Sequence, residues 1–220
     1  MIEEVVIVSG FAGCGKSRLV RGIFAGRWPS IVETLRLNVN ESWVVCDSAS
    51  LPGLVEDGTE RRVVLEYGIL RPEAPDWGAG AALQWVQQAQ RTTTLAVWCE
   101  PGVLARRIRR RLWRTVARAP IRLLHRRRKR SSGLPQVNAA ASRSRRASAR
   151  SFVRQAILLH GSLAVLYREY PNVIRDIFDR WVDYAAGLPD GAVWIIDTTE
   201  EIPCLRHPEE WRRKSANARS

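Results

Sequence analysis

The sequence predicts an α/β fold of three layers, in which helices cover both faces of a parallel sheet. Apolar runs without polar alternation, such as Glu4–Val8 and Ala192–Ile196, indicate buried strands. Stretches with apolar residues at helical spacing separate these runs, and this alternation is typical of α/β proteins. The chain has 220 residues, of which 45% are hydrophobic, and is therefore long enough for one domain, with or without an insertion.

The predicted elements follow one another with glycine, proline or acidic residues between them. Strands are expected at 4–8, 42–46, 62–65, 93–99 and 192–196, and helices at 16–25, 80–90, from about 102 onward, 152–170 and 173–186. Residues 29–41 have no clear period, and the helical pattern is lost after Pro120. Residues 131–151 are rich in Ser, Ala and Arg, which predicts a mobile loop or a partly disordered segment, and the polar residues beyond Arg206 are expected to fray.

The positive charge is concentrated in one segment. The chain carries a net charge of +13, and residues 101–150 contain 17 Lys and Arg and no Asp or Glu. The other residues contain 18 basic and 22 acidic side chains. We therefore expect any polyanion, nucleic acid included, to bind through residues 101–150.

The sequence predicts no targeting segment, no zinc site and no disulfide framework. No apolar run approaches the roughly 18 residues of a membrane span. The N-terminus opens with Glu3 and Glu4 instead of a basic region, so no secretory signal is predicted and the cytoplasm is the expected compartment. The cysteines lie far apart without CxxC spacing, which argues against a zinc site and a disulfide framework; they are Cys14, Cys46, Cys99 and Cys204.

Residues 10–17, GFAGCGKS, match the phosphate-binding pattern G-x-x-x-x-G-K-[ST]. A predicted strand precedes this segment and a predicted helix follows it, which is the context that the pattern requires. Lys16 would reach the β- and γ-phosphates, and the Ser17 hydroxyl would bind Mg²⁺. The predicted nucleotide-binding residues are Gly10, Gly13, Cys14, Gly15, Lys16 and Ser17. The sequence thus predicts binding of ATP or GTP with Mg²⁺.

Three carboxylates follow predicted strands, and ligands of open α/β sheets bind at the carboxyl ends of strands. Asp47 is a candidate base for the proton of a substrate hydroxyl. Glu66 is a candidate to hold Mg²⁺ through water or to orient substrate. Asp197, in AVWIIDTTEE, is an alternative magnesium-binding aspartate of the Walker B kind. Each of the three could instead be a surface carboxylate that caps a loop or helix.

The basic segment opens with an amphipathic helix. Its apolar stripe recurs at every fourth residue: Leu104, Ile108, Leu112 and Val116. The other faces carry arginines, of which one to three are expected to reach a transferring phosphoryl group; they are Arg106, Arg107, Arg110, Arg111 and Arg114. Trp113 is expected to cover apolar surface in preference to stacking on a base.

The order of these motifs resembles the P-loop small-molecule and nucleotide kinases, in particular the kinase-like ATP-binding proteins related to zeta toxins and polynucleotide kinases. The resemblance covers about residues 3–118 and 190–199. It implies a P-loop NTPase fold with an arginine-rich lid, and an ATP-dependent phosphotransferase that acts on a hydroxyl-bearing acceptor. It also implies Asp47 as the catalytic acid/base, Glu66 as the carboxylate after the third strand, and Arg111 or Arg114 as the lid arginine.

Under this reading residues 1–118 form the nucleotide-binding core, 119–150 a basic lid or mobile insertion, 151–205 the completion of the core, and 206–220 a polar tail. The alternatives are an NTPase directed to nucleic acid, a polynucleotide kinase that uses residues 101–150, and a non-enzymatic P-loop module anchored by its basic segment. The short distance from strand 93–99 to the arginine helix favours the small-molecule or nucleotide kinase.

Overall fold

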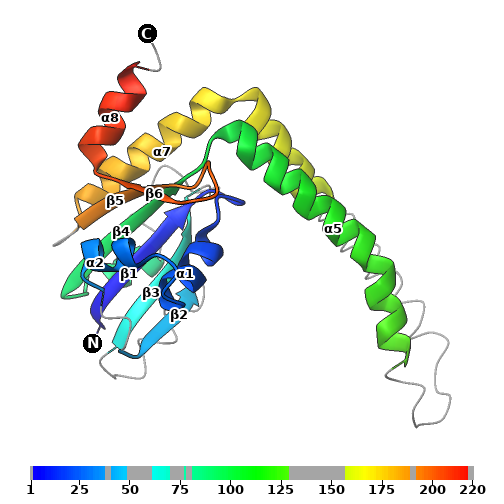
Figure 1. Cartoon of the computed structure of the whole chain (residues 1–220), viewed down its shortest axis with the longest axis horizontal. Helices are drawn as coiled ribbons and strands as arrows, with labels where there is room; N and C mark the ends of the chain where they lie inside the picture. The colour runs from blue at the N-terminus through cyan, green and yellow to red at the C-terminus, as the bar shows by residue number, and fades with distance from the viewer. Residues whose placement is uncertain are drawn as a thin grey trace. The chain divides into compact units, whose positions relative to one another are not determined.

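The computed structural model describes residues 2–37, 41–48, 61–69, 77, 81–128, 157–188 and 192–217. The chain divides into two compact units. Unit 1 comprises Met1–Glu100 and Asn172–Ser220 and contains the sheet, whereas unit 2 comprises Pro101–Pro171 (Figure 1).

Unit 1 is built on a sheet of six strands in the order β2-β3-β1-β4-β5-β6. The strands are β1 (Ile2–Gly10), β2 (Trp43–Asp47), β3 (Arg61–Gly68), β4 (Arg91–Trp98), β5 (Ala192–Asp197) and β6 (Cys204–Arg206). All neighbouring pairs are parallel except β5 and β6, which are antiparallel. The predicted α/β class with a largely parallel sheet is confirmed, and the short antiparallel strand β6 is an addition that the sequence did not predict.

Helices cover both faces of the sheet. Alternate residues of a strand point to opposite faces, and Val6 and Val8 line a small pocket together with residues of α1 (Lys16–Phe24). Ser9, on the opposite face, accepts a hydrogen bond from Trp181 of α7 (Pro171–Ala186) at 2.7 Å. Helices α1 and α7 therefore lie on opposite sides of β1.

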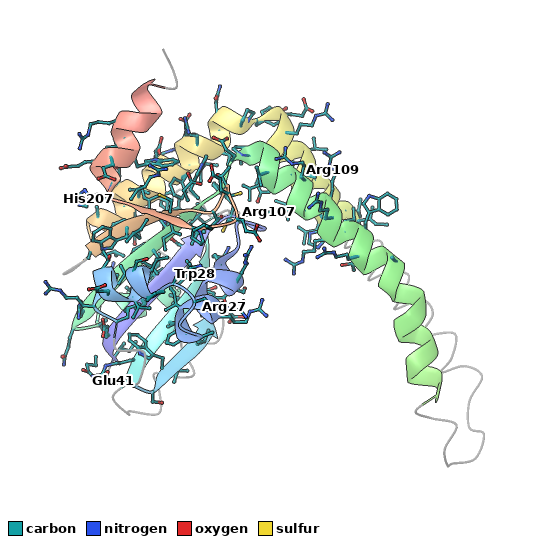
Figure 2. All side chains as sticks on the ribbon, viewed as in Figure 1. Arg27, Trp28, Glu41, Arg107, Arg109 and His207 are labelled. Atoms are coloured by element: carbon teal, nitrogen blue, oxygen red, sulfur yellow. The ribbon has the colours of Figure 1, made fainter. Side chains whose placement is uncertain are left out.

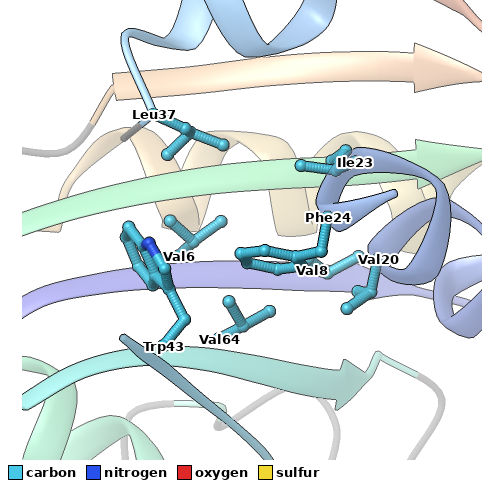
Figure 3. Close-up of a pocket in the computed structure, with 8 residues that line it drawn as sticks. All are labelled: Val6, Val8, Val20, Ile23, Phe24, Leu37, Trp43 and Val64. Carbon is cyan, nitrogen blue, oxygen red and sulfur yellow. The ribbon is translucent and has the colours of Figure 1, made fainter. Parts of the chain in front are cut away.

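The pocket beneath α1 is entirely apolar (Figure 3). Its lining residues come from α1, three strands and the segment after α2 (Pro29–Leu35): Val6, Val8, Val20, Ile23, Phe24, Leu37, Trp43 and Val64. Because the lining presents only apolar surface to the cavity, we interpret this pocket as a packing gap of the core.

Aromatic rings fill the opposite face. The Trp181 ring stacks on Tyr67 of β3 with centroids 5.1 Å apart, and Phe178 lies 4.9 Å from Trp98 of β4. Trp211, only 2% exposed, contacts the Trp98 ring from α8 (Pro208–Asn217). The expectation of a fraying tail is therefore wrong for residues 208–217, because a single buried tryptophan fixes an otherwise polar helix.

Other element boundaries depart from the sequence-based predictions. Helix α2 lies within residues 29–41, where no period was visible, because its seven residues cover only about two turns. Helix α4 (Ala81–Val86) is shorter than the predicted 80–90. Helix α5 (Pro101–Arg128) continues through Pro120, where the pattern was expected to end. The predicted loop at 131–151 lies outside the described residues.

Unit 2 contains α5 and a helix at residues 157–169, the described part of the helix predicted over 152–170. Leu104 and Ile108 of α5 and Tyr167 of the second helix are fully buried. Burial, with the charge of Arg111 as a smaller cause, lowers the pKa of His160. No helix in the described part of the chain combines the length and the apolar character needed to cross a bilayer.

Candidate functional site

A glycine loop, residues 10–15, joins the end of β1 to the start of α1. Gly10 has a φ of 151°, and a Cβ atom there would lie 2.6 Å from the Val97 carbonyl oxygen. A side chain at this position would therefore collide with the backbone of β4. Gly15 is the N-cap of α1 with a left-handed φ of 103° and provides no side-chain cap. The first N–H groups of α1 are thus left to other acceptors, and an anion is a suitable one.

Lys16 holds its ammonium group against the loop. Its Nζ donates hydrogen bonds to the carbonyl oxygens of Gly10 at 2.8 Å and Phe11 at 2.9 Å. The loop itself is held by a turn in which the Cys14 N–H donates to the Phe11 carbonyl, and Gly13 within it has a positive φ of 87°. This arrangement keeps the only lysine of the site, half-buried, beside the glycines that the sequence assigned to phosphate binding.

Thr198 supports the glycine loop through a hydrogen bond to its backbone, a role that sequence reasoning missed. Its buried hydroxyl lies 2.6 Å from the Cys14 carbonyl oxygen and 2.9 Å from the Trp98 carbonyl oxygen, so its single proton can be donated to either of these acceptors. The Thr198 N–H also donates to the Trp98 carbonyl at 3.0 Å. The position of the threonine directly after strand β5 is the only sequence signal for this contact.

Ser17 and Glu66 meet at the carboxyl edge of the sheet. The Ser17 hydroxyl donates to Glu66 Oε2 at 2.7 Å. The parallel pairing of β1 with β3 sets this contact, because it places Glu66 beside Val8 on the face that α1 covers. The two residues that the sequence assigned separately to a metal are therefore adjacent in space.

Asp47 lies next to Glu66 on the neighbouring strand. The register of β2 on β3 pairs the two residues, so both side chains leave the sheet on the same face. Asp47 is exposed at the strand end. Burial, with the Asp47 charge as a smaller cause, raises the pKa of the Cys46 thiol to about 11. At neutral pH Cys46 is thus uncharged and adds no further anion to the two carboxylates.

The oxygen atoms at this edge suit a magnesium ion. Mg²⁺ prefers hard oxygen ligands and is usually held by one or two carboxylates together with substrate phosphates and water. The Ser17 hydroxyl and the Glu66 carboxylate supply such oxygens within hydrogen-bonding distance of each other, directly beside the glycine loop. The residues present therefore fit the ion that the sequence predicted.

Asp197 is less suited to that role. Strand β4 separates β5 from β1, and the register pairs Asp197 with Trp98, whose ring faces α7. Asp197 therefore leaves the sheet on the face opposite Ser17. Its Oδ1 accepts a hydrogen bond from the Thr199 N–H at 3.0 Å, as a carboxylate that caps its own turn does. The geometry favours Glu66 over Asp197 as the carboxylate beside the loop.

The predicted phosphate-contacting arginines belong to unit 2. Arg111 and Arg114 lie on α5 and are both exposed. Their role over the phosphates stays a prediction.

Trp113 does not cover apolar surface as expected. The side chain is 72% exposed, whereas Leu104 and Ile108 of the predicted stripe are fully buried and Leu112 is half-buried. The expectation for Trp113 is therefore wrong, because the apolar stripe occupies a different side of the helix. Comparison with protein-family models, with curated proteins and with solved structures finds no match to this chain.

Proposed function

We propose that the chain is an ATP-dependent phosphotransferase of P-loop fold that transfers the γ-phosphate to a hydroxyl of a small molecule or nucleotide. The observation that carries this proposal is the 2.7 Å hydrogen bond between Ser17 and Glu66. It joins a phosphate-binding motif to the carboxylate of an adjacent strand, and Asp47 is the next carboxylate in register. If the glycine motif had arisen by chance, Ser17, Glu66 and Asp47 would not be expected to lie together at the carboxyl edge of the sheet.

Each residue has a defined task in this proposal. The loop N–H groups and Lys16 bind the β- and γ-phosphates, and Ser17 and Glu66 hold Mg²⁺. The ion neutralises phosphate charge when bound. Asp47 accepts the proton of the acceptor hydroxyl as the new O–P bond forms, while the bond from the γ-phosphorus to the β-phosphate oxygen breaks and ADP leaves.

Calorimetry with ATP tests the binding half of the proposal. Lys16→Ala removes the cation that pairs with the phosphates, so we expect affinity to fall at least about tenfold. Arg27→Ala is the matched control, because it removes an exposed cation just beyond α1 that lies outside the glycine loop. Equal affinities of Lys16→Ala and wild type would refute the assignment of the loop.

A screen for γ-phosphate transfer to pooled hydroxyl acceptors tests the catalytic half. Asp47→Asn should retain ATP affinity and lose about 10²–10⁴-fold in rate, as expected for loss of a general base. Glu66→Gln should require more Mg²⁺ for the same rate, whereas Glu33→Gln, an exposed carboxylate on α2, should not. Full transfer by Asp47→Asn combined with loss in Asp197→Asn would show that the carboxylate assignments are wrong.

A further inference from the structure

Helix α5 presents one continuous exposed face. Its side chains occupy positions i, i+3, i+4, i+7 and i+8, which share one side of a helix. We call this set the α5 face: Arg106, Arg109, Arg110, Trp113 and Arg114. All five side chains are exposed, whereas Leu104, Ala105 and Ile108 on the other side of the helix are buried (Arg109 is labelled in Figure 2).

The positive charge of this face has no carboxylate partner among the described side chains of unit 2. Residues 101–171 contain 19 Lys and Arg but a single acid, Glu169, which pairs with Arg168 at 3.4 Å. Among the described side chains, no carboxylate pairs with Arg106, Arg109, Arg110 or Arg114. Like charges at this spacing destabilise a helix, so the face gains stability from an anionic partner.

Trp113 identifies the kind of anion. Its neighbours on the helix surface are Arg109 and Arg110, one turn earlier, so an exposed ring lies among guanidinium groups. Single-stranded nucleic acid has both features that such a surface recognises, namely phosphates for the arginines and unpaired bases that stack on an aromatic ring. In a duplex the bases are stacked on one another and offer no free face to Trp113.

A membrane fits the same surface less well. A helix that lies in a bilayer interface buries a broad apolar face in the lipid. Leu104, Ala105 and Ile108 on the other side of α5 are already buried, and Trp113 is the only large apolar side chain of the α5 face. The balance of four cations to one ring therefore favours a polyanion over a lipid surface.

We propose that the α5 face binds single-stranded nucleic acid, with Trp113 stacked on a base and the four arginines on neighbouring phosphates. This proposal is argued from α5 alone and does not rest on the assignment of the glycine loop to nucleotide binding. The test is fluorescence anisotropy of the full chain with a labelled single strand of about 15 nucleotides and with a duplex of the same sequence. Each is measured at about 50 and 200 mM salt.

Trp113→Ala should weaken binding of the single strand about 5- to 100-fold and leave duplex binding nearly unchanged, because only the unpaired bases stack. Trp113→Phe retains a ring and should restore most of the affinity. Arg110→Gln should weaken binding of both probes and reduce the salt slope for the single strand by about 0.7, the value for one phosphate contact.

Two control variants match these changes outside the α5 face. Leu158→Ala removes an apolar side chain of the other helix of unit 2 that is 61% exposed. Arg168→Gln removes the exposed cation that pairs with Glu169. Both should bind the single strand as wild type does. Lys16→Ala should also bind it normally, so failure of the phosphotransferase proposal and failure of this one are distinguishable.

Unchanged single-strand affinity in Trp113→Ala would overturn the proposal, as would equal affinities for strand and duplex in the wild type. Flotation with phosphatidylserine vesicles examines the lipid alternative. Vesicle binding that depends on Trp113, together with oligonucleotide binding that does not, would assign the surface to a membrane and overturn the proposal.

Discussion

Ser9 is a buried hydroxyl that connects three elements just before the glycine loop. It accepts a hydrogen bond from the Trp181 indole of α7 at 2.7 Å and donates to the Leu95 carbonyl of β4 at 3.4 Å. The residue is fully buried, so water cannot replace either partner. The position of the loop at the end of β1 therefore depends on a polar contact inside an aromatic cluster.

Ser9→Ala should destabilise unit 1. The substitution leaves the Trp181 N–H buried without an acceptor, which costs about 1–3 kcal/mol of unfolding free energy. Urea denaturation followed by tryptophan fluorescence measures this loss. Ser162→Ala removes an exposed hydroxyl that bonds the Leu158 carbonyl and should change stability by less than about 0.5 kcal/mol.

A second substitution isolates the hydrogen bond itself. Trp181→Phe removes the indole N–H, so in that background Ser9→Ala should cost much less than in the wild type. Equal costs of Ser9→Ala in both backgrounds would show that the Ser9–Trp181 bond contributes nothing to stability.

At the scale of single elements, two helical glycines have opposite surroundings. A Cβ at Gly161, in the helix at 157–169, would have no atom within 4 Å, whereas a Cβ at Gly22 of α1 would overlap the ring of Trp28. Glycine within a helix is less favourable than alanine by about 1 kcal/mol when nothing opposes the added methyl group. The sequence alone does not distinguish these two positions.

We expect the same substitution to have opposite signs at the two sites. Gly161→Ala should slow amide hydrogen exchange of residues 157–169, by about fivefold if the full 1 kcal/mol is realised. Gly22→Ala should instead lower the unfolding free energy by about 1–3 kcal/mol, because the Trp28 ring must move. Stabilisation by Gly22→Ala would contradict the packing of Trp28 against α1.

Local chemistry explains which elements could be predicted from sequence. Strand β1 and helix α1 lie next to one another in the chain and carry the turn residues that define their ends, so the glycine loop was predicted in place. Glu66 and Asp47 were predicted as strand ends, but their adjacency follows from strand order, which no local pattern encodes. Thr198 was missed because its partner Cys14 is 184 residues away in the chain.

The sequence contains residues typical of a helix start at α8, but the polar composition of this segment argued against an ordered helix. Pro208 begins the helix, and Glu209 and Glu210 occupy its first turn, which are favourable residues for a helix start. The polar composition suggested a fraying tail. The burial of Trp211 stabilises the helix, and its contacts with Trp98 and Phe178 become visible only in the folded chain.

The molecule as a whole separates its charges between its two units. Unit 2 holds 19 of the 35 basic residues and one of the 22 acids. Exposed like charges interact over about 10 Å at 0.1 M ionic strength, so the arginines of α5 repel one another along the helix. Unit 1 holds the remaining acids and has no comparable excess of basic residues.

The stability of α5 should therefore rise with salt while that of the sheet does not. Hydrogen exchange measured by mass spectrometry at about 0.05 and 0.5 M NaCl should show amides of α5 exchanging several-fold more slowly at the higher salt, as the repulsion is screened. Peptides of β1 and β4 are the internal control and should exchange at the same rate in both. Salt-independent exchange of α5 would mean that other contacts already neutralise its arginines.

Because α7 and β5 lie late in the chain, the ribosome synthesises them well after strands β1 to β4. Strands β1 to β4 are complete at Trp98, but the helix that covers their aromatic face begins only at Pro171. At a synthesis rate of about 5–20 residues per second, on the order of 4–15 seconds pass between the synthesis of Trp98 and the start of α7. The aromatic face of the sheet is uncovered during this interval. The residues made in that interval are mostly those of unit 2, so the nascent protein displays an open aromatic sheet and a growing polycation together. A chaperone that shields Tyr67 and Trp98 during those seconds would protect the chain at its most vulnerable stage.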